Sequence, residues 1–153
     1  MRIVIQRVSR ASVSIGGELH SSIGHGLMVL VGIAEGDTEA DVRKLAAKTV
    51  ALRVFADEAG VMNRSVADAG GEILAVSQFT LLADVRRGNR PSYIRAAAHE
   101  TAIPLYELYC GECARLLGRP TLRGVFGADM QVELVNDGPV TIVIDSDTFR
   151  KDT

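Results

Sequence analysis

A short polar segment, Ser77-Gln78-Phe79-Thr80, combines two hydroxyl groups with an amide and follows a run of apolar residues. Polar groups at the end of a buried strand are held by the strand and open to ligand beyond it, a common place for a functional site. Neither hydroxyl has an adjacent histidine or carboxylate to activate it as a nucleophile. The segment therefore favours hydrogen bonding to an oxyanion over covalent catalysis. A polar strand end that satisfies only its own backbone explains the same residues equally well.

The loop that follows carries a cluster of positive charge. Residues 84–95 contain one acidic residue, Asp84, and four arginines, Arg86, Arg87, Arg90 and Arg95, whereas the whole chain has a net charge of −2. Such a cluster can hold phosphate groups. It can also be a solvated loop, because short charge clusters are common on protein surfaces, and the sequence leaves both interpretations open.

Two cysteines, Cys110 and Cys113, are three residues apart in a segment with helical periodicity. A redox pair needs an exposed thiolate at a helix N-terminus, and a structural zinc needs four ligands, which no histidine here is spaced to complete. We expect both cysteines to be small buried hydrophobic residues and expect no metal site. P-loop, HExxH, GxSxG and EF-hand patterns do not occur in the sequence.

Asn136-Asp137-Gly138-Pro139 connects two late apolar segments and has the composition of a turn. Only about 5–6% of X-Pro bonds in folded proteins are cis, so the dipeptide alone does not predict a cis bond.

The composition is that of an ordinary globular protein, with 153 residues, 47% of them hydrophobic and 24% charged. A chain of this length fits one domain with a packed core. The longest apolar run, residues 27–31, is far shorter than the about 20 residues of a membrane-spanning helix, and no signal peptide is recognisable. We therefore expect no membrane span and a cytoplasmic location. The slightly negative net charge means that any nucleic-acid contact must be local.

A framework of strands must position these residues. Residues 3–5 and 11–15 alternate along the chain, and Gly16-Gly17 predicts a hairpin turn after them. Residues 27–33 are apolar on both faces, which suits a central buried strand. Further strands are expected at 53–56 and at 73–76, the latter running into Ser77-Gln78-Phe79-Thr80-Leu81.

Two segments have the periodicity of helices. In the first, Thr38 and Asp41 are spaced as a capping box, and an apolar stripe continues to about Leu52. The second is expected over 100–117, with Pro104 in its first turn, where a missing N–H costs little, and Gly118 at its end.

The chain then returns to strands, expected at 122–126, 131–135 and 140–144, before a polar, frayed tail over 146–153. Six or seven strands and two helices in this grouping are neither a βαβ alternation nor a pure sandwich. We predict a single domain over residues 1–145 of the α+β class. Its curved, largely antiparallel sheets form barrel-like β/β/α layers, with two main helices packed on the outside.

Several segments together are more specific than any motif above. They are Ser77-Gln78-Phe79-Thr80-Leu81, Arg87-Gly88-Asn89-Arg90-Pro91-Ser92, Ala128-Asp129-Met130-Gln131-Val132, Asn136-Asp137-Gly138-Pro139-Val140-Thr141, and, near the start, Ile5-Gln6-Arg7-Val8 with Ala11-Ser12-Val13. In order and spacing they closely resemble the D-aminoacyl-tRNA deacylase family, the D-tyrosyl-tRNA deacylases of bacterial and eukaryotic type. The resemblance extends from the first strand to about Ile144.

This resemblance implies an enzyme that hydrolyses the ester joining a D-amino acid to the terminal ribose of tRNA, with no metal or organic cofactor. It would reject L-aminoacyl-tRNA, and it would also act on glycyl-tRNA, which has no side chain to exclude. The family further implies a homodimer with its active site at the subunit interface. Gly138 and Pro139 of one subunit, joined by a cis bond, would enter the partner's active site and select the chirality.

The resemblance also assigns the catalytic floor to Ser77, Gln78, Phe79 and Thr80. The Phe79 N–H would donate to the oxyanion, and Gln78 and Ser77 would orient the ester. Thr80 matches a position proposed as a nucleophile in the family. The alternative is assistance by the ribose 2′-hydroxyl of the substrate, which we prefer because Thr80 has no recognisable base.

Four more residues are implied in substrate binding. Arg7 and Met130 match positions that line the pocket, with Arg7 holding the Gly-Pro loop, and Arg87 and Arg90 would contact the tRNA. Two other hypotheses remain: a non-catalytic nucleic-acid-binding module that uses the 86–95 loop, and a hydrolase of small D-amino acid esters or peptides.

Overall fold

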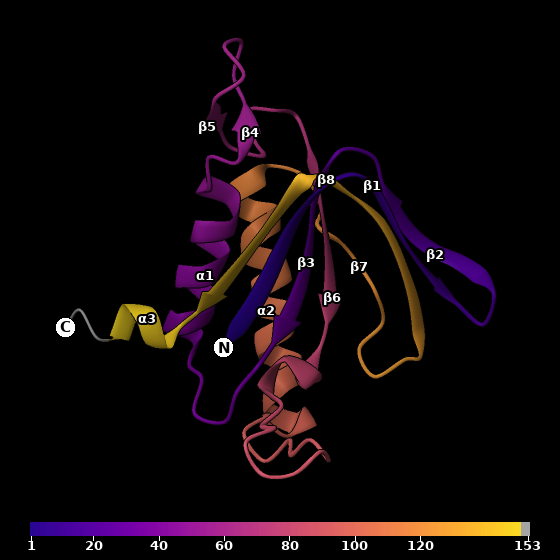
Figure 1. The fold of residues 1–153 in the computed structure, drawn as a ribbon, viewed down its shortest axis with the longest axis vertical. Helices are drawn as coiled ribbons and strands as arrows, with labels where there is room; N and C mark the ends of the chain where they lie inside the picture. Colours follow the sequence, from indigo (N-terminus) through magenta and orange to yellow (C-terminus); the bar gives the residue numbers. More distant parts are fainter. Residues whose placement is uncertain (151–153) are drawn as a thin grey trace.

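The computed structural model describes residues 1–150, and its centre is one six-stranded, strongly curved sheet (Figure 1). The strand order is β2-β1-β3-β6-β7, and β8 pairs with the other edge of β1. The bounds are β1 (Arg2–Ile15), β2 (Glu18–Ile23), β3 (Gly26–Gly32), β6 (Glu72–Ser77), β7 (Leu122–Arg123) and β8 (Met130–Asp145). The predicted hairpin at Gly16-Gly17 joins β1 to β2 and is confirmed.

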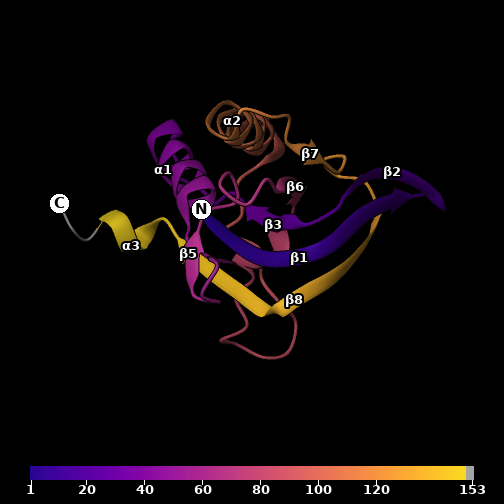
Figure 2. The same cartoon turned by 90° about the horizontal axis from the view of Figure 1, so that it is seen from above.

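Two helices, α1 (Glu39–Ala51) and α2 (His99–Leu117), cover one face of β3 and β6, and β1 and β8 curve round the opposite side (Figure 2). The remaining elements are the hairpin β4 (Phe55–Ala56) and β5 (Met62–Arg64), the 3₁₀ helix η1 (Phe79–Leu82) and the short helix α3 (Asp147–Arg150). The predicted α+β class, with a curved, barrel-like sheet and two main helices outside it, is confirmed. Within residues 1–150, no helix combines the length and hydropathy needed to cross a bilayer.

β3 is buried on both faces because each face packs against a different core. Leu27, Val29 and Val31 belong to the core beneath the helices. Met28 belongs to a second, smaller core, which also contains Val8 of β1 and Leu74 of β6. The unbroken apolar run therefore forms the central strand that the sequence predicts.

α1 begins as predicted. The Thr38 hydroxyl accepts the Asp41 N–H at 3.3 Å, and the Asp41 carboxylate accepts the Thr38 N–H at 2.9 Å, which completes the capping box. The helix ends at Ala51 with Leu52 as its C-cap.

α2 ends as predicted at Gly118, whose φ of 77° is left-handed. Its start differs from the prediction for Pro104. Because the N-cap is Ala98, Pro104 lies in the second turn and not the first, where it removes an N–H that would otherwise donate to the Glu100 carbonyl.

Tyr106 ties α2 to the sheet beside the site. Its fully buried hydroxyl donates to the Ala75 carbonyl of β6 at 3.1 Å, and burial raises the pKa of Tyr106, which keeps this donor protonated. Tyr106→Phe is expected to lower the free energy of unfolding by about 1 kcal/mol in a denaturant titration. The control Tyr93→Phe changes a side chain that is 40% exposed and should leave stability unchanged. Equal losses in both variants would contradict this role.

Three of the expected strands differ in the structure. Residues 131–135 and 140–144 are not two strands joined by a turn: both belong to β8, and both pair with β1. The intervening residues 137–140 bulge out of the ladder between the Gln6–Thr141 and Val8–Asn136 pairs, where the register shifts, and do not reverse the chain. The strand expected at 122–126 is only Leu122–Arg123, because the chain turns at 125–128. Finally, β6 ends at Ser77, and the chain enters η1 instead of continuing as a strand.

The expected frayed tail is also wrong where the structure describes it. Ser146 is 1% exposed, and its N–H donates to the Met1 carbonyl at 2.9 Å. Residues Asp147–Arg150 then form α3, which packs back toward α1. The last three residues of the predicted tail, 151–153, lie outside the described residues.

Candidate active site

A pocket of about 590 Å³ opens where β6 ends, a volume typical of small-molecule sites. Its walls come from β3, β6, η1, the loop before α2, the first turn of α2 and the start of β8. The lining residues are Val31, Ile33, Val76, Ser77, Gln78, Phe79, Tyr93, Ala96, Ala97, His99, Ala102, Phe126, Gly127, Ala128, Asp129, Met130 and Val132. Three of the four residues predicted for the catalytic floor, and Met130, therefore lie in one cavity.

The backbone at the end of β6 is arranged to expose a donor. The Gln78 N–H donates to the Val31 carbonyl at 2.7 Å, which keeps the segment attached to β3. Phe79 is the first residue of η1, so its N–H has no carbonyl acceptor within that helix. Phe79 lines the pocket, and its N–H donates to no backbone carbonyl of the described residues. The Phe79 ring is 55% exposed and contacts Tyr93 edge-on, with ring centroids 5.0 Å apart.

Thr80 lies at the surface beside the pocket and is not among its lining residues. Its hydroxyl accepts a hydrogen bond from the Gln78 side-chain amide. An amide is a donor here and cannot remove the hydroxyl proton, and within residues 1–150 no histidine or carboxylate hydrogen-bonds to this hydroxyl.

The pocket also contains two ionisable residues that the sequence analysis did not assign to the site, His99 and Asp129. His99 begins α2 and packs edge-on against Phe126, with ring centroids 5.4 Å apart. Asp129 directly precedes the first residue of β8. A polar residue at the start of a strand is the sequence signal that could have assigned Asp129 to the site.

Gly138 and Pro139 lie outside the pocket of their own chain, as does Arg7. The bond between Gly138 and Pro139 is cis. Arg7 holds this loop: its Nε donates to the Asp137 carbonyl at 3.1 Å, and its Nη1 donates to the Val54 carbonyl at 2.7 Å.

Asn136 fixes the loop from within. Its side-chain oxygen accepts the Val140 N–H at 3.2 Å, and its amide nitrogen donates to the Thr141 hydroxyl at 3.0 Å. The bulge in β8 therefore has a defined shape and presents the Gly138-Pro139 backbone at the surface.

The arginine-rich loop is only partly neutralised. Arg86 pairs with Asp84 at 2.6 Å, and this hydrogen bond lowers the pKa of Asp84 to about 2. Arg87 lines a shallow hollow of about 440 Å³ together with Asp84, Arg86 and Ser92. Neither Arg87 nor Arg90 forms an ion pair with any residue in 1–150, so both keep an unpaired positive charge.

The cysteines have the structural role that the sequence predicts. Cys110 and Cys113 are fully buried free thiols, and burial raises their pKa values to about 11 and about 12. Neither is a thiolate at neutral pH. In the described part of the chain, no three His, Cys, Asp or Glu side chains are grouped as metal ligands.

The model of one protein family, described as D-Tyr-tRNA(Tyr) deacylase, matches residues 4–145. The chain belongs to this family. The match begins within β1, includes all the residues that line the pocket, and ends before α3.

Curated relatives named D-aminoacyl-tRNA deacylase are similar over almost the whole chain. The Parabacteroides distasonis protein is 59% identical over 146 residues, which are 95% of this chain and 97% of the relative. The Akkermansia muciniphila protein is 60% identical over 146 residues, again 95% of this chain and 97% of the relative. The Roseiflexus protein is 58% identical over 151 residues, 99% of this chain and 97% of the relative.

Two solved structures have the same fold as this chain. One, named c-Myc DNA Unwinding Element Binding Protein, has a TM-score of 0.90 and is 44% identical over 95% of this chain and 98% of that chain. The other, titled as a probable eukaryotic D-amino acid tRNA deacylase, has a TM-score of 0.80 over 94% of this chain and 97% of that chain. Its 16% identity makes it evidence of the fold alone.

Proposed function

We propose that this chain hydrolyses the ester bond of D-aminoacyl-tRNA and releases the free D-amino acid and tRNA. The observation that carries the proposal is the free Phe79 N–H at the floor of a 590 Å³ pocket in a member of this deacylase family. Relatives about 60% identical over nearly the full chain, named D-aminoacyl-tRNA deacylase, support the same activity.

Ester hydrolysis in this pocket needs stabilisation of the negative charge that develops on the carbonyl oxygen. The Phe79 N–H donates to this oxyanion, and Ser77 and Gln78 orient the ester beside it. The hydroxyl partner of Gln78, Thr80, has no base, so the substrate's own ribose 2′-hydroxyl assists the reaction. The protein then contributes position and electrostatics, and forms no acyl-enzyme.

Chiral selection comes from a second subunit. The Gly138-Pro139 loop is held rigid by Arg7 and lies outside the pocket of its own chain, so it is placed to enter the site of a partner in a homodimer. Its backbone carbonyls would occupy the side on which an L side chain projects, and an apolar side chain against an unsatisfied carbonyl is rejected. A penalty of about 4 kcal/mol gives roughly thousandfold discrimination. Glycyl-tRNA has no side chain to exclude, so it is also hydrolysed.

The unpaired charges of Arg87 and Arg90 are suited to phosphates of the tRNA acceptor end. Two such contacts predict a modest salt dependence, about −0.7 in log–log slope for each phosphate neutralised on a single strand. Because charged tRNA is the substrate of translation, we place the enzyme in the cytoplasm.

Thr80→Ala distinguishes the two mechanisms. With the 2′-hydroxyl as the assisting group, the variant is expected to keep kcat within about tenfold of wild type, since only an orienting contact to Gln78 is lost. Single-turnover hydrolysis of D-tyrosyl-tRNA measures this, with trapping of any acyl-enzyme as the second readout. Loss of all turnover together with a trapped acyl-enzyme in wild type would show that Thr80 is the nucleophile.

The proposed function is tested by incubating the purified chain with D-tyrosyl-tRNA and, separately, with D-tyrosine ethyl ester. We expect rapid release of D-tyrosine from the tRNA and little from the small ester. Salt-sensitive binding of the tRNA with the ester left intact would instead show a nucleic-acid-binding module. Equal rates on both substrates would show a hydrolase of small esters.

A further inference from the structure

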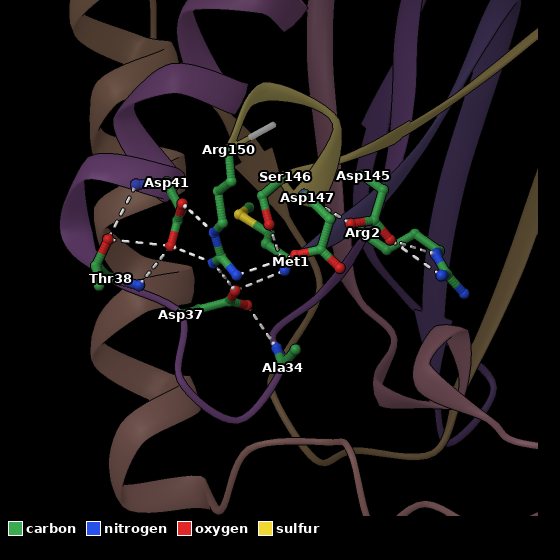
Figure 3. A network of polar contacts seen from close by, with 10 residues as sticks. All are labelled: Met1, Arg2, Ala34, Asp37, Thr38, Asp41, Asp145, Ser146, Asp147 and Arg150. Atoms are coloured by element: carbon green, nitrogen blue, oxygen red, sulfur yellow. Dashed lines mark hydrogen bonds and ion pairs between the residues drawn. The ribbon is translucent and has the colours of Figure 1, made fainter. Parts of the chain in front are cut away.

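A partly buried ionic cluster joins α3 and the start of the chain to the N-terminus of α1 (Figure 3). The Asp37 carboxylate, 1% exposed, accepts hydrogen bonds from the Met1 α-amino group at 2.6 Å and from the Arg150 guanidinium at 3.2 Å. Arg150 also pairs with Asp41 at 2.6 Å and with Asp147 at 3.0 Å. One arginine therefore bridges three carboxylates, one in the turn before α1, one on α1 and one on α3.

A second contact holds α3 against α1. The Phe149 ring packs against the main core, and the Nζ atoms of Lys44 and Lys48 lie 5.2 Å and 5.8 Å from its centroid. Cation–π contacts of this kind add to the ion pairs of Arg150. α3 is thus docked by both its apolar and its charged side chains.

The Asp37 carboxylate also fixes a tight turn. Its Oδ2 accepts the Ala34 N–H at 2.6 Å, while the Asp37 N–H donates to the Ala34 carbonyl at 3.1 Å. A buried carboxylate that loses a counter-charge is strongly destabilised, so the shape of this turn depends on its cationic partners.

The turn is directly paired with a wall of the pocket. The Glu35 N–H donates to the Arg95 carbonyl at 2.8 Å, and the Ala97 N–H donates to the Ile33 carbonyl at 3.0 Å. Residues on both sides of this pairing line the cavity, namely Ile33, Ala96 and Ala97. Hydrogen bonds, together with the short backbone segment 33–37, therefore connect Arg150 to the pocket wall.

We propose that Asp37 and Arg150 are positioning residues of the deacylase site: α3 holds the 34–37 turn, and the turn sets the 95–97 wall of the pocket. This inference rests on the proposed function for its kinetic part only. Neither residue lines the pocket. Burial raises the pKa of the Asp41 carboxyl, but the hydrogen bonds from Arg150 and Thr38 outweigh this and leave its pKa below the usual value, so Asp41 stays charged as a partner of Arg150 at neutral pH.

Arg150→Gln tests the proposal in the full-length chain, because this half-exposed side chain can be changed without opening the core. Amide hydrogen exchange is expected to accelerate at Glu35 and Ala97, and kcat/KM for D-tyrosyl-tRNA to fall, each by between about twofold and thirtyfold. Arg150→Lys keeps a charge and should recover part of both. Arg115→Gln is the matched control, since it removes a partly exposed arginine that pairs with the buried Glu112 on α2, and it should change neither.

Wild-type exchange at Glu35 and Ala97 in Arg150→Gln would overturn the proposal, whatever the activity. Faster exchange with an unchanged kcat/KM would overturn it as well, since the turn would then not set the pocket. If the wild-type chain released no D-tyrosine, the proposed function would have failed, and the exchange measurement alone would decide whether α3 holds the turn.

Discussion

Phe79→Pro is expected to lower kcat for D-tyrosyl-tRNA by roughly 100- to 1,000-fold, the usual cost of one oxyanion donor. Proline removes the N–H that the mechanism requires. It is tolerated at the first position of a helix, where Phe79 stands in η1, so the fold should persist. Single-turnover kinetics and a thermal melt of the same preparation would measure both effects.

Phe79→Ala is the matched control for this variant. It keeps the N–H and loses only the edge-on contact with Tyr93, so its kcat should fall far less. Equal losses in the alanine and proline variants would assign the effect to the ring and would remove the oxyanion role of the backbone.

Gly138→Ala is expected to abolish most of a roughly thousandfold preference for the D substrate. Gly138 has a φ of 127°, which side-chain-bearing residues rarely adopt, and a Cβ there would lie 3.1 Å from Arg7 Nη2 and 3.0 Å from Val140 Cγ2. The loop must shift, and its carbonyls would then no longer face the L side chain. Rates with D- and L-tyrosyl-tRNA, measured in parallel, give the ratio.

Gly60→Ala separates this effect from backbone strain. Gly60 also has a positive φ, 80°, but has open space around it, in the turn after β4. The variant should lose some stability and keep the wild-type ratio. A similar fall in selectivity for both variants would show that general destabilisation, and not the Gly138 loop, controls chirality.

The parts of the fold that depend on neighbouring residues were predictable from the sequence. The Thr38–Asp41 capping box, the Gly118 helix end and the apolar run of β3 each need only local chemistry, and each was confirmed. Pairing between distant segments was not predictable in this way. The parallel β3–β6 and β6–β7 pairs, each spanned by a helix, and the single long β8 depend on partners that composition does not specify.

The site shows the same division. The Ser77–Phe79 backbone could be located because it follows a buried strand, but the 95–97 wall could not, since it reaches the pocket through pairing with residues 33–35. Arg150 lies in a polar segment with no periodicity, which is why a frayed tail was expected. Its carboxylate partners Asp37 and Asp41 lie more than a hundred residues earlier in the chain.

Selection by exclusion of L side chains needs no recognition of the D side chain. Hydrolysis of D-tyrosyl-, L-tyrosyl- and glycyl-tRNA by the same wild-type preparation distinguishes exclusion from recognition. We predict rapid release from the D-tyrosyl and glycyl forms and release from the L-tyrosyl form about a thousandfold slower. Equal rates for the two tyrosyl substrates, or glycyl-tRNA as resistant as the L form, would contradict the account.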